Sequence, residues 1–197
     1  LFIADEVQPG FARTGDAFWG FERHGLVPDM VTMGKPMGNG FPLSGTAMRP
    51  ELVQEFGEKA RYFNTFGGNP VAAAAGMAVL DVIADEGLQN NAATVGGALK
   101  NGLQDIAARY PEIGHVRGAG LFLAVECVTS RATNAPDAAR AKFVVNHMRQ
   151  NGVLISATGP GANVLKIRPP LVLQQPEAAL FLDVAEAAFA AARAAGI

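Results

Sequence analysis

The chain is poor in cysteine, in charged residues and in long apolar runs. Its single cysteine, Cys127, excludes an internal disulfide framework and fits a reducing compartment. Charged residues make up 17% of the 197 residues and the formal net charge is −2, so no basic field is available for nucleic acid. No apolar run is long enough to span a membrane, because Glu186 and Arg193 interrupt the alanine-rich C-terminal stretch. We therefore expect a cytoplasmic protein with neither nucleic-acid nor membrane partners.

Apolar residues, in contrast, are abundant. They make up 49% of the chain, which is typical of a folded globular protein with one large domain or two modest ones. No signal peptide is visible, and the chain opens at Leu1 inside a strand-like run, so we expect the natural N-terminus to lie upstream. His24, His115 and His147 lack the spacing of metal ligands, and we expect no metal site.

Hydrophobic periodicity and turn residues predict an α/β protein. The predicted helices cover residues 70–86, 88–110, 136–150 and 176–195, the first opened by the cap pair Asn69-Pro70. The predicted strands cover residues 1–5, 30–33, 43–48, 153–155 and 164–167, with a turn leading into a further strand across residues 116–126. The domain boundary is predicted near residue 100, inside the second helix.

Two side chains suggest chemistry. Lys35 lies in a glycine-rich turn after the strand at 30–33, and its neighbours offer no acidic partner. Asp5 ends the apolar strand at the start of the chain, where an unremarkable turn carboxylate is the competing interpretation. For Lys35 the competing interpretation is a surface lysine whose stem packs on apolar atoms. An amine and a carboxylate at the ends of two strands suit a Schiff-base enzyme built around pyridoxal phosphate.

Four segments together resemble the class III (ornithine/GABA-type) aminotransferases, which are fold-type I pyridoxal-phosphate enzymes. They are ADEVQPGFARTG, TMGKPMGNGFPLSG, YFNTFGGNP and NVLKIRPPL, in the order in which the family carries them. The resemblance implies that residues 1–100 are the C-terminal part of the large cofactor domain. It implies that residues 101–197 are the small α+β C-terminal domain, and that the N-terminal half of the family fold is absent.

The resemblance also implies roles for four residues. Asp5 pairs with the pyridine nitrogen of the cofactor, and Gln8 donates to its phenolic oxygen. Lys35 forms the Schiff base and then serves as general base. Thr65 binds the cofactor phosphate of a neighbouring subunit, which implies a homodimer with the active site at the interface. Thr65 as an ordinary helix-entry residue is the competing interpretation.

The substrate anchor departs from the family pattern. Many members carry an arginine that holds the substrate carboxylate in a two-pronged fork, and here Lys166 stands at that position, with Arg168 two residues later. A lysine there resembles the alanine–glyoxylate aminotransferase 2-like branch, which includes phospho-lyases acting on phosphoethanolamine or phosphohydroxylysine. Aminotransferase chemistry on an amine or amino acid and a keto acid is the main prediction. A phospho-lyase and a truncated, non-catalytic fragment are the alternatives.

Overall fold

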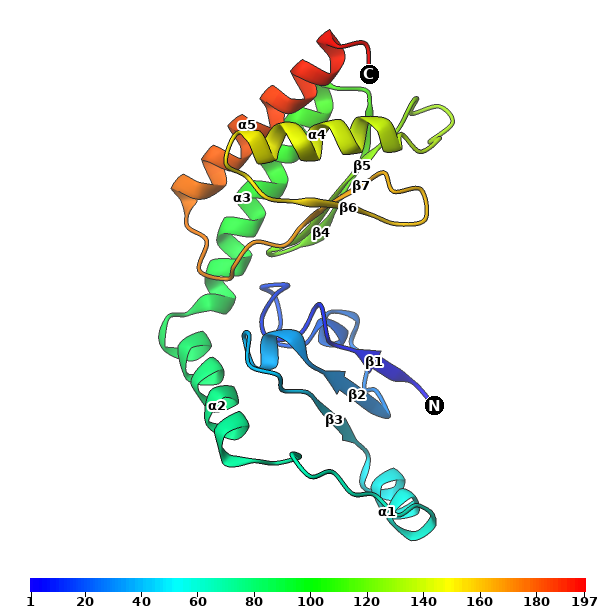
Figure 1. The fold of residues 1–197 in the computed structure, drawn as a ribbon, viewed down its shortest axis with the longest axis vertical. Coiled ribbons are helices and arrows are strands. Elements are labelled where there is room, and N and C mark those ends of the chain that lie inside the picture. Colours follow the sequence, from blue (N-terminus) through cyan, green and yellow to red (C-terminus); the bar gives the residue numbers. More distant parts are fainter. The chain divides into compact units, whose positions relative to one another are not determined.

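The computed structural model describes all 197 residues, and they divide into two compact units, residues 1–89 and 90–197. Each unit has a sheet of its own: β1-β2-β3 in unit 1 and β4-β5-β7-β6 in unit 2 (Figure 1). Mixed helices and strands confirm the predicted α/β class. The assignment of the two parts to a large and a small domain, with a boundary near residue 100, stays a prediction.

The sheet of unit 1 mixes strand directions. Strand β1 (Ile3–Asp5) runs parallel to β2 (Met30–Met33), in a register that pairs Asp5 with Thr32. Strand β3 (Gly45–Met48) is antiparallel to β2 on its other side. Since β1 and β2 are parallel, their carboxyl ends lie at the same edge of the sheet, where ligands of α/β proteins commonly bind.

The helices of unit 1 differ in how well they are packed. The 3₁₀ helices are η1 (Gly20–His24) and η2 (Lys35–Met37), and the α-helices are α1 (Pro50–Lys59) and α2 (Pro70–Asp85). As predicted, Asn69 caps α2, its side-chain oxygen accepting the Ala72 N–H at 2.9 Å. Gly76 lets α2 lie on the loop after η2, because a Cβ there would be 2.9 Å from the Leu43 side chain. Helix α1 was not predicted, and none of its residues is buried.

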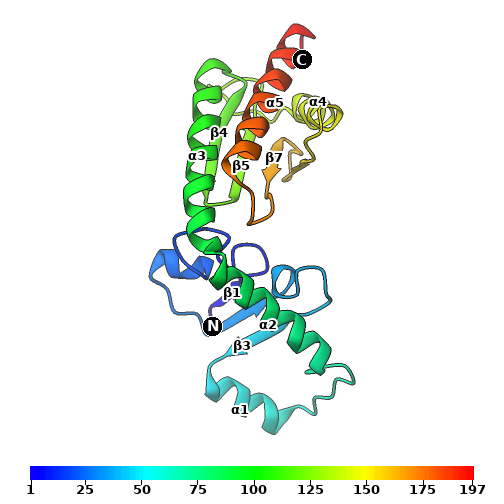
Figure 2. The same cartoon turned by 90° about the vertical axis from the view of Figure 1, so that its left-hand side faces the viewer.

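Unit 2 is a two-layer structure with an antiparallel sheet. Its helices are α3 (Leu88–Arg109), α4 (Ala138–Gln150) and α5 (Gln175–Ala194). Its strands are β4 (Ile113–Ala119), β5 (Phe122–Cys127), β6 (Ser156–Thr158) and β7 (Val164–Ile167). Every pair of neighbouring strands is antiparallel. Figure 2 shows α3 and α5 running along the sheet in this unit.

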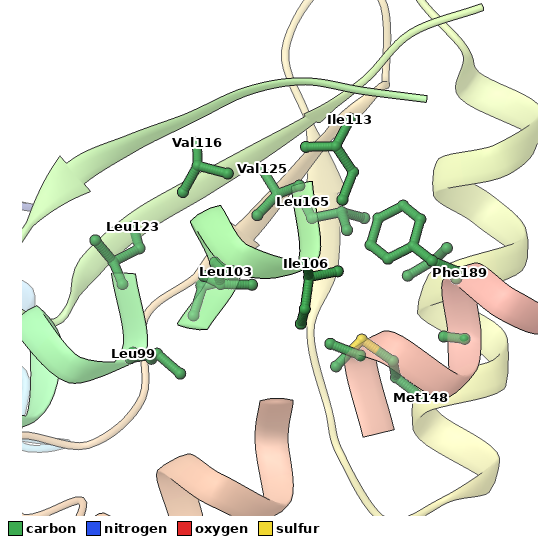
Figure 3. Close-up of a cluster of buried hydrophobic side chains, with 14 of the residues drawn as sticks. Leu99, Leu103, Ile106, Ile113, Val116, Leu123, Val125, Met148, Leu165 and Phe189 are labelled. Atoms are coloured by element: carbon green, nitrogen blue, oxygen red, sulfur yellow. The ribbon is translucent and has the colours of Figure 1, made fainter. Parts of the chain in front are cut away.

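The core of unit 2 follows from strict alternation along its strands. In β5 every second residue is buried, and these side chains meet apolar residues from all three helices (Figure 3). Ten of the side chains in this cluster are Leu99, Leu103, Ile106, Ile113, Val116, Leu123, Val125, Met148, Leu165 and Phe189. The other face of the sheet carries polar residues, including the ion pair between Arg117 and Glu126 at 2.5 Å.

Helix α3 approaches the β4–β5 hairpin unusually closely. A Cβ on Gly96 would lie 2.2 Å from the carbonyl carbon and oxygen of Gly120, at the tip of the hairpin. One turn further along the helix, the Lys100 ammonium donates to the Gly118 carbonyl at 2.8 Å. Only glycine at position 96 permits this contact, which fixes the hairpin against the helix.

Three sequence predictions need correction. The apolar strand predicted at residues 1–5 is shorter, covering Ile3–Asp5, and it is not a buried strand: Leu1 is 86% exposed and Ile3 54%, because no neighbouring element in unit 1 covers them. The strand at 153–155 is wrong: the Val153 N–H bonds to the Met148 carbonyl at the end of α4, and the ladder begins only at Ser156. Strand β4 was taken for a turn, because its glycines and charged residues hide a ladder that its pairing with β5 supplies.

Candidate active site

Asp5 stands at the carboxyl end of β1, with its side chain exposed. Its carboxylate accepts the Val7 N–H at 3.1 Å, which fixes the turn that follows the strand. The next residue extends the parallel pairing, since the Glu6 N–H donates to the Thr32 carbonyl at 2.9 Å. The carboxylate is therefore held on a rigid support and remains open to a ligand.

Lys35 stands at the carboxyl end of β2, directly after Gly34. Its backbone has φ of +38°, in the left-handed region that side chains other than glycine rarely adopt. The side chain is exposed, and its ammonium makes no hydrogen bond or ion pair. Strain of this kind gathers at functional sites, where the surrounding structure over-determines it.

The turns that carry Asp5 and Lys35 lie next to each other. A Cβ built on Gly34 would be 3.8 Å from the Val7 side chain. Half-buried Gln8 follows Val7 in the same turn. The structure thus brings the predicted carboxylate, amide and amine to one edge of the sheet of unit 1.

Thr65 lies elsewhere in unit 1, in an exposed turn. The Asn64 side-chain oxygen organises that turn by accepting the N–H groups of Phe66 at 3.1 Å and Gly67 at 3.0 Å. In Figures 1 and 2 the connection between α1 and α2 runs past β3, on the side away from β1. The structure does not bring Thr65 to the edge that carries Asp5 and Lys35.

Lys166 and Arg168 belong to unit 2, where they line one pocket of about 710 Å³. Lys166 lies in β7, paired with Ala124 and Ser156, and Arg168 follows two residues later, on the same face. The Arg168 guanidinium lies over the Phe122 ring, 5.5 Å from its centroid, and burial lowers its pKa below the usual value. The pocket wall is otherwise largely apolar, with Leu154, Phe181 and other residues of the segment after α4 and of α5.

Sequence reasoning missed Glu6, which is only 2% exposed. Its carboxylate accepts the N–H groups of Gly20 at 2.7 Å and Phe21 at 2.9 Å. A signal was available, because Glu6 is two residues after the buried Ala4 and so lies on the same, inward face of the strand. Cys127 is buried, and burial raises the pKa of its thiol to about 12.

No three His, Cys, Asp or Glu side chains are grouped so that they could hold a metal ion. No helix has both the length and the apolar character needed to cross a membrane.

Comparison with known protein families shows to which family these residues belong. The sequence profile of the family described as aminotransferase class-III matches residues 1–189. This chain belongs to the class-III aminotransferase family. The resemblance given by the four segments is therefore confirmed, and so is the fold-type I architecture, which the solved structures of class-III relatives share.

The chain is similar to both aminotransferases and a phospholyase. It is 49% identical over 183 residues to alanine–glyoxylate aminotransferase 2 homolog 2, mitochondrial, of Arabidopsis thaliana, covering 93% of this chain and 38% of that protein. A solved Arthrobacter phospholyase in complex with phosphoethanolamine is 45% identical, with a TM-score of 0.91, over 95% of this chain and 44% of the other. A PLP-bound amine transaminase from an uncultivated Pseudomonas species is 35% identical, with a TM-score of 0.87, over 96% and 44%. The chain thus spans less than half the length of these relatives.

The residues at the edge of unit 1 fit the cofactor of this family, which is pyridoxal phosphate, as predicted. An unpaired amine on a strained turn is available to the cofactor carbonyl, and an exposed carboxylate to its ring nitrogen. Gly34, directly before Lys35, keeps the turn small, since a Cβ there would come into ordinary contact with the side chains of Ser44 and Val7, at 3.7 Å and 3.8 Å. The donor set therefore matches the group.

Proposed function

We propose that this chain carries the Schiff-base lysine of a pyridoxal-phosphate-dependent aminotransferase that moves an amino group between an amine or amino acid and a keto acid. The observation that supports this best is the shared carboxyl edge of β1 and β2, which presents Asp5 and Lys35 from neighbouring turns. Two neighbouring parallel strands are a rigid support for groups that must hold one cofactor between them.

Each residue at this edge has a defined role. When bound, pyridoxal phosphate supplies an electron sink for negative charge at the carbon that bears the amine. Asp5 holds a proton on the ring nitrogen, because a fixed anion favours the protonated form. The Gln8 amide donates to the phenolic oxygen. Lys35 binds the cofactor covalently and, once the substrate frees its amine, moves a proton at the substrate carbon.

Lys35 can be tested by chemical trapping in the full-length gene product that contains this chain. Borohydride reduction should leave phosphopyridoxyl mass on the Lys35 peptide, and mass on another lysine alone would refute the assignment. Lys35→Ala should lower the turnover rate by several orders of magnitude, while cofactor still binds through Asp5. Lys59→Ala is the matched control, because Lys59 is an exposed lysine of the same unit and pairs only with Glu55. A protein that binds no cofactor would favour the non-catalytic alternative.

We also propose a homodimer, in which Thr65 binds the cofactor phosphate of the partner subunit. The turn that carries Thr65 is flanked by aromatic side chains that unit 1 leaves uncovered: Tyr62 is 70% exposed, Phe63 82% and Phe66 80%. Exposed apolar patches of this kind mark association surfaces. Sedimentation of the full-length gene product should give a dimer. A fully active monomer at the same concentration would contradict this role for Thr65.

The substrate anchor is proposed to be the cation pair of Lys166 and Arg168. Both line one pocket, so together they present two positive charges to one anionic group. Lys166→Ala should raise KM by roughly 10- to 150-fold, because a lost charge-assisted hydrogen bond costs about 1.5–3 kcal/mol. Lys142→Ala, an exposed lysine on α4, is the control and should leave KM unchanged. An unchanged KM in Lys166→Ala would leave Arg168 as the anchor.

A phospho-lyase acting on phosphoethanolamine or phosphohydroxylysine is the second candidate. It is favoured by the lysine at position 166, because a point charge beside Arg168 suits a phosphate as well as a carboxylate. A phospho-lyase should release phosphate and ammonia without a keto acid. An aminotransferase should need pyruvate or glyoxylate as acceptor and release no phosphate. Measuring both products with and without the acceptor distinguishes the two.

The predicted cytoplasmic location stays a prediction.

A further inference from the structure

Glu6 is a buried carboxylate that none of the proposed roles uses. It lies between the two residues proposed to contact the cofactor ring, Asp5 and Gln8. Burying a charge is costly unless hydrogen bonds satisfy it, so its retention at 2% exposure calls for a structural reason. The two backbone N–H groups that it accepts, from Gly20 and Phe21, supply that reason.

These bonds close a loop. Residues 6–20 leave the end of β1 and return to it, and the Glu6 carboxylate joins the two ends by capping the first turn of η1. The Glu6 carbonyl also accepts the Gly10 N–H at 3.1 Å. One residue therefore holds the strand end, the turn after it and the returning helix.

The loop is packed so tightly that these bonds determine where Gln8 lies. A Cβ on Gly20 would overlap Pro9 at 2.5 Å, and a Cβ on Gly10 would lie 3.1 Å from the Trp19 ring. Phe11 and Ala12 both have positive φ, of 58° and 63°, so the loop is held in a conformation that it would not adopt unaided. Releasing Glu6 would let the Pro9–Gly10 segment relax, and Gln8 with it.

We propose that Glu6 is a positioning residue for the cofactor site: its bonds to Gly20 and Phe21 fix Asp5 and Gln8 at the angles at which they meet the cofactor. This rests on the proposed function. Glu6 touches neither cofactor nor substrate in this scheme, and acts only through the backbone on either side of it. A displacement of about 1 Å in such a support can change a rate roughly 100-fold.

The chain offers a matched control in Glu22. Its exposed carboxylate caps the same 3₁₀ helix from the other side, accepting the Trp19 N–H at 2.9 Å. Glu22→Ala, which removes that acceptor, therefore weakens η1 but leaves the backbone of Asp5 and Gln8 held by Glu6. A difference between Glu6→Gln and Glu22→Ala separates positioning from simple stability.

The test follows the visible absorbance of the bound cofactor in the full-length gene product. In Glu6→Gln, an Asp5 that is displaced holds the ring-nitrogen proton less firmly. The ring nitrogen then carries less positive charge. We expect this to raise the midpoint, the pH at which the visible absorbance of the bound cofactor is half changed, and to make the cofactor dissociate faster. Glu22→Ala should lower the melting temperature without moving the midpoint. If Glu6→Gln does not fold, Glu6→Asp, which keeps the charge but is too short to reach both N–H groups, should show the same shift.

Two results would be decisive against these ideas, and they differ. A midpoint and a release rate unchanged from wild type in a folded Glu6 variant, with only the melting temperature lowered, would overturn the positioning role alone. A wild-type protein without any cofactor absorbance would overturn the proposed function and the positioning role together.

Discussion

Substitution by alanine should have opposite effects on stability at Gly96 and at Gly97. Both lie in α3, where alanine is favoured over glycine by about 1 kcal/mol. A Cβ on Gly97 meets nothing within 4 Å, so Gly97→Ala should stabilise the protein by up to that amount. A Cβ on Gly96 would be 2.2 Å from the Gly120 backbone, where 3.4 Å begins ordinary contact, so helix and hairpin must separate by about 1.2 Å.

The expected cost of that separation exceeds the helical gain. Overpacking of this kind costs about 1–3 kcal/mol, and here the obstacle is backbone, which cannot rotate away as a side chain can. Gly96→Ala should therefore melt below Gly97→Ala, by roughly 2–4 °C per kcal/mol on the scale of a 197-residue chain and by less in the longer gene product. Differential scanning calorimetry of the full-length gene product measures the two melting temperatures.

Hydrogen exchange locates the effect. Gly96→Ala should lose amide protection in β4 and β5, around the contact between Lys100 and Gly118, whereas Gly97→Ala should not. Equal melting temperatures for the two variants, or a more stable Gly96→Ala, would refute the close approach of α3 to the hairpin.

Three further predictions concern unit 2. Leu103→Ala should cost about 2–5 kcal/mol in denaturant unfolding, because the side chain is fully buried, whereas exposed Leu26→Ala should cost under about 0.5; equal losses would contradict the core. Cys127 should react with a thiol reagent only as fast as the protein opens, since burial raises its pKa to about 12; rapid reaction in the native state would contradict its burial. The hydrogen bond from Arg193 holds the pKa of Glu112 below 4.5, so the stability that it contributes is present above that pH and is lost as pH falls through the lowered value. Melting curves between about pH 7 and pH 3 should be less acid-sensitive in Glu112→Gln, and an unaltered acid slope would count against the pair.

The sequence predicted correctly the elements whose ends are marked by capping residues or prolines. The cap at Asn69 with Pro70 located the start of α2, and the apolar run that ends before Pro169-Pro170 located β7. Strands β4 and β6 were missed or displaced because pairing with β5 and β7, not their own residues, makes them strands. Helix α1 carries no buried face, so periodicity gave no reason to expect it.

The residues of the candidate site likewise divide into those that the sequence predicts and those that it does not. Asp5 and Lys35 could be found from the sequence because each follows an apolar strand, and the parallel register then brings them to one edge. The strain at Lys35 could not be foreseen, since a φ of +38° results from packing around the turn and not from the lysine itself. Glu6 was overlooked because an acidic residue in a strand is expected on the outer face, and only its two backbone partners explain the inward one.

The antiparallel sheet of unit 2 also has a consequence for the order of folding. Strands β4 and β5 are joined by two residues, Gly120 and Leu121, and β6 joins β7 through residues 159–163, so these pairs close short loops. The parallel pair β1–β2 must instead close the long connection across residues 6–29, at a greater entropic cost. We expect pulsed hydrogen labelling during refolding to protect β4 and β5 before β1, so that the hairpin is in place before the edge that presents Lys35 has formed; protection of β1 first would contradict this.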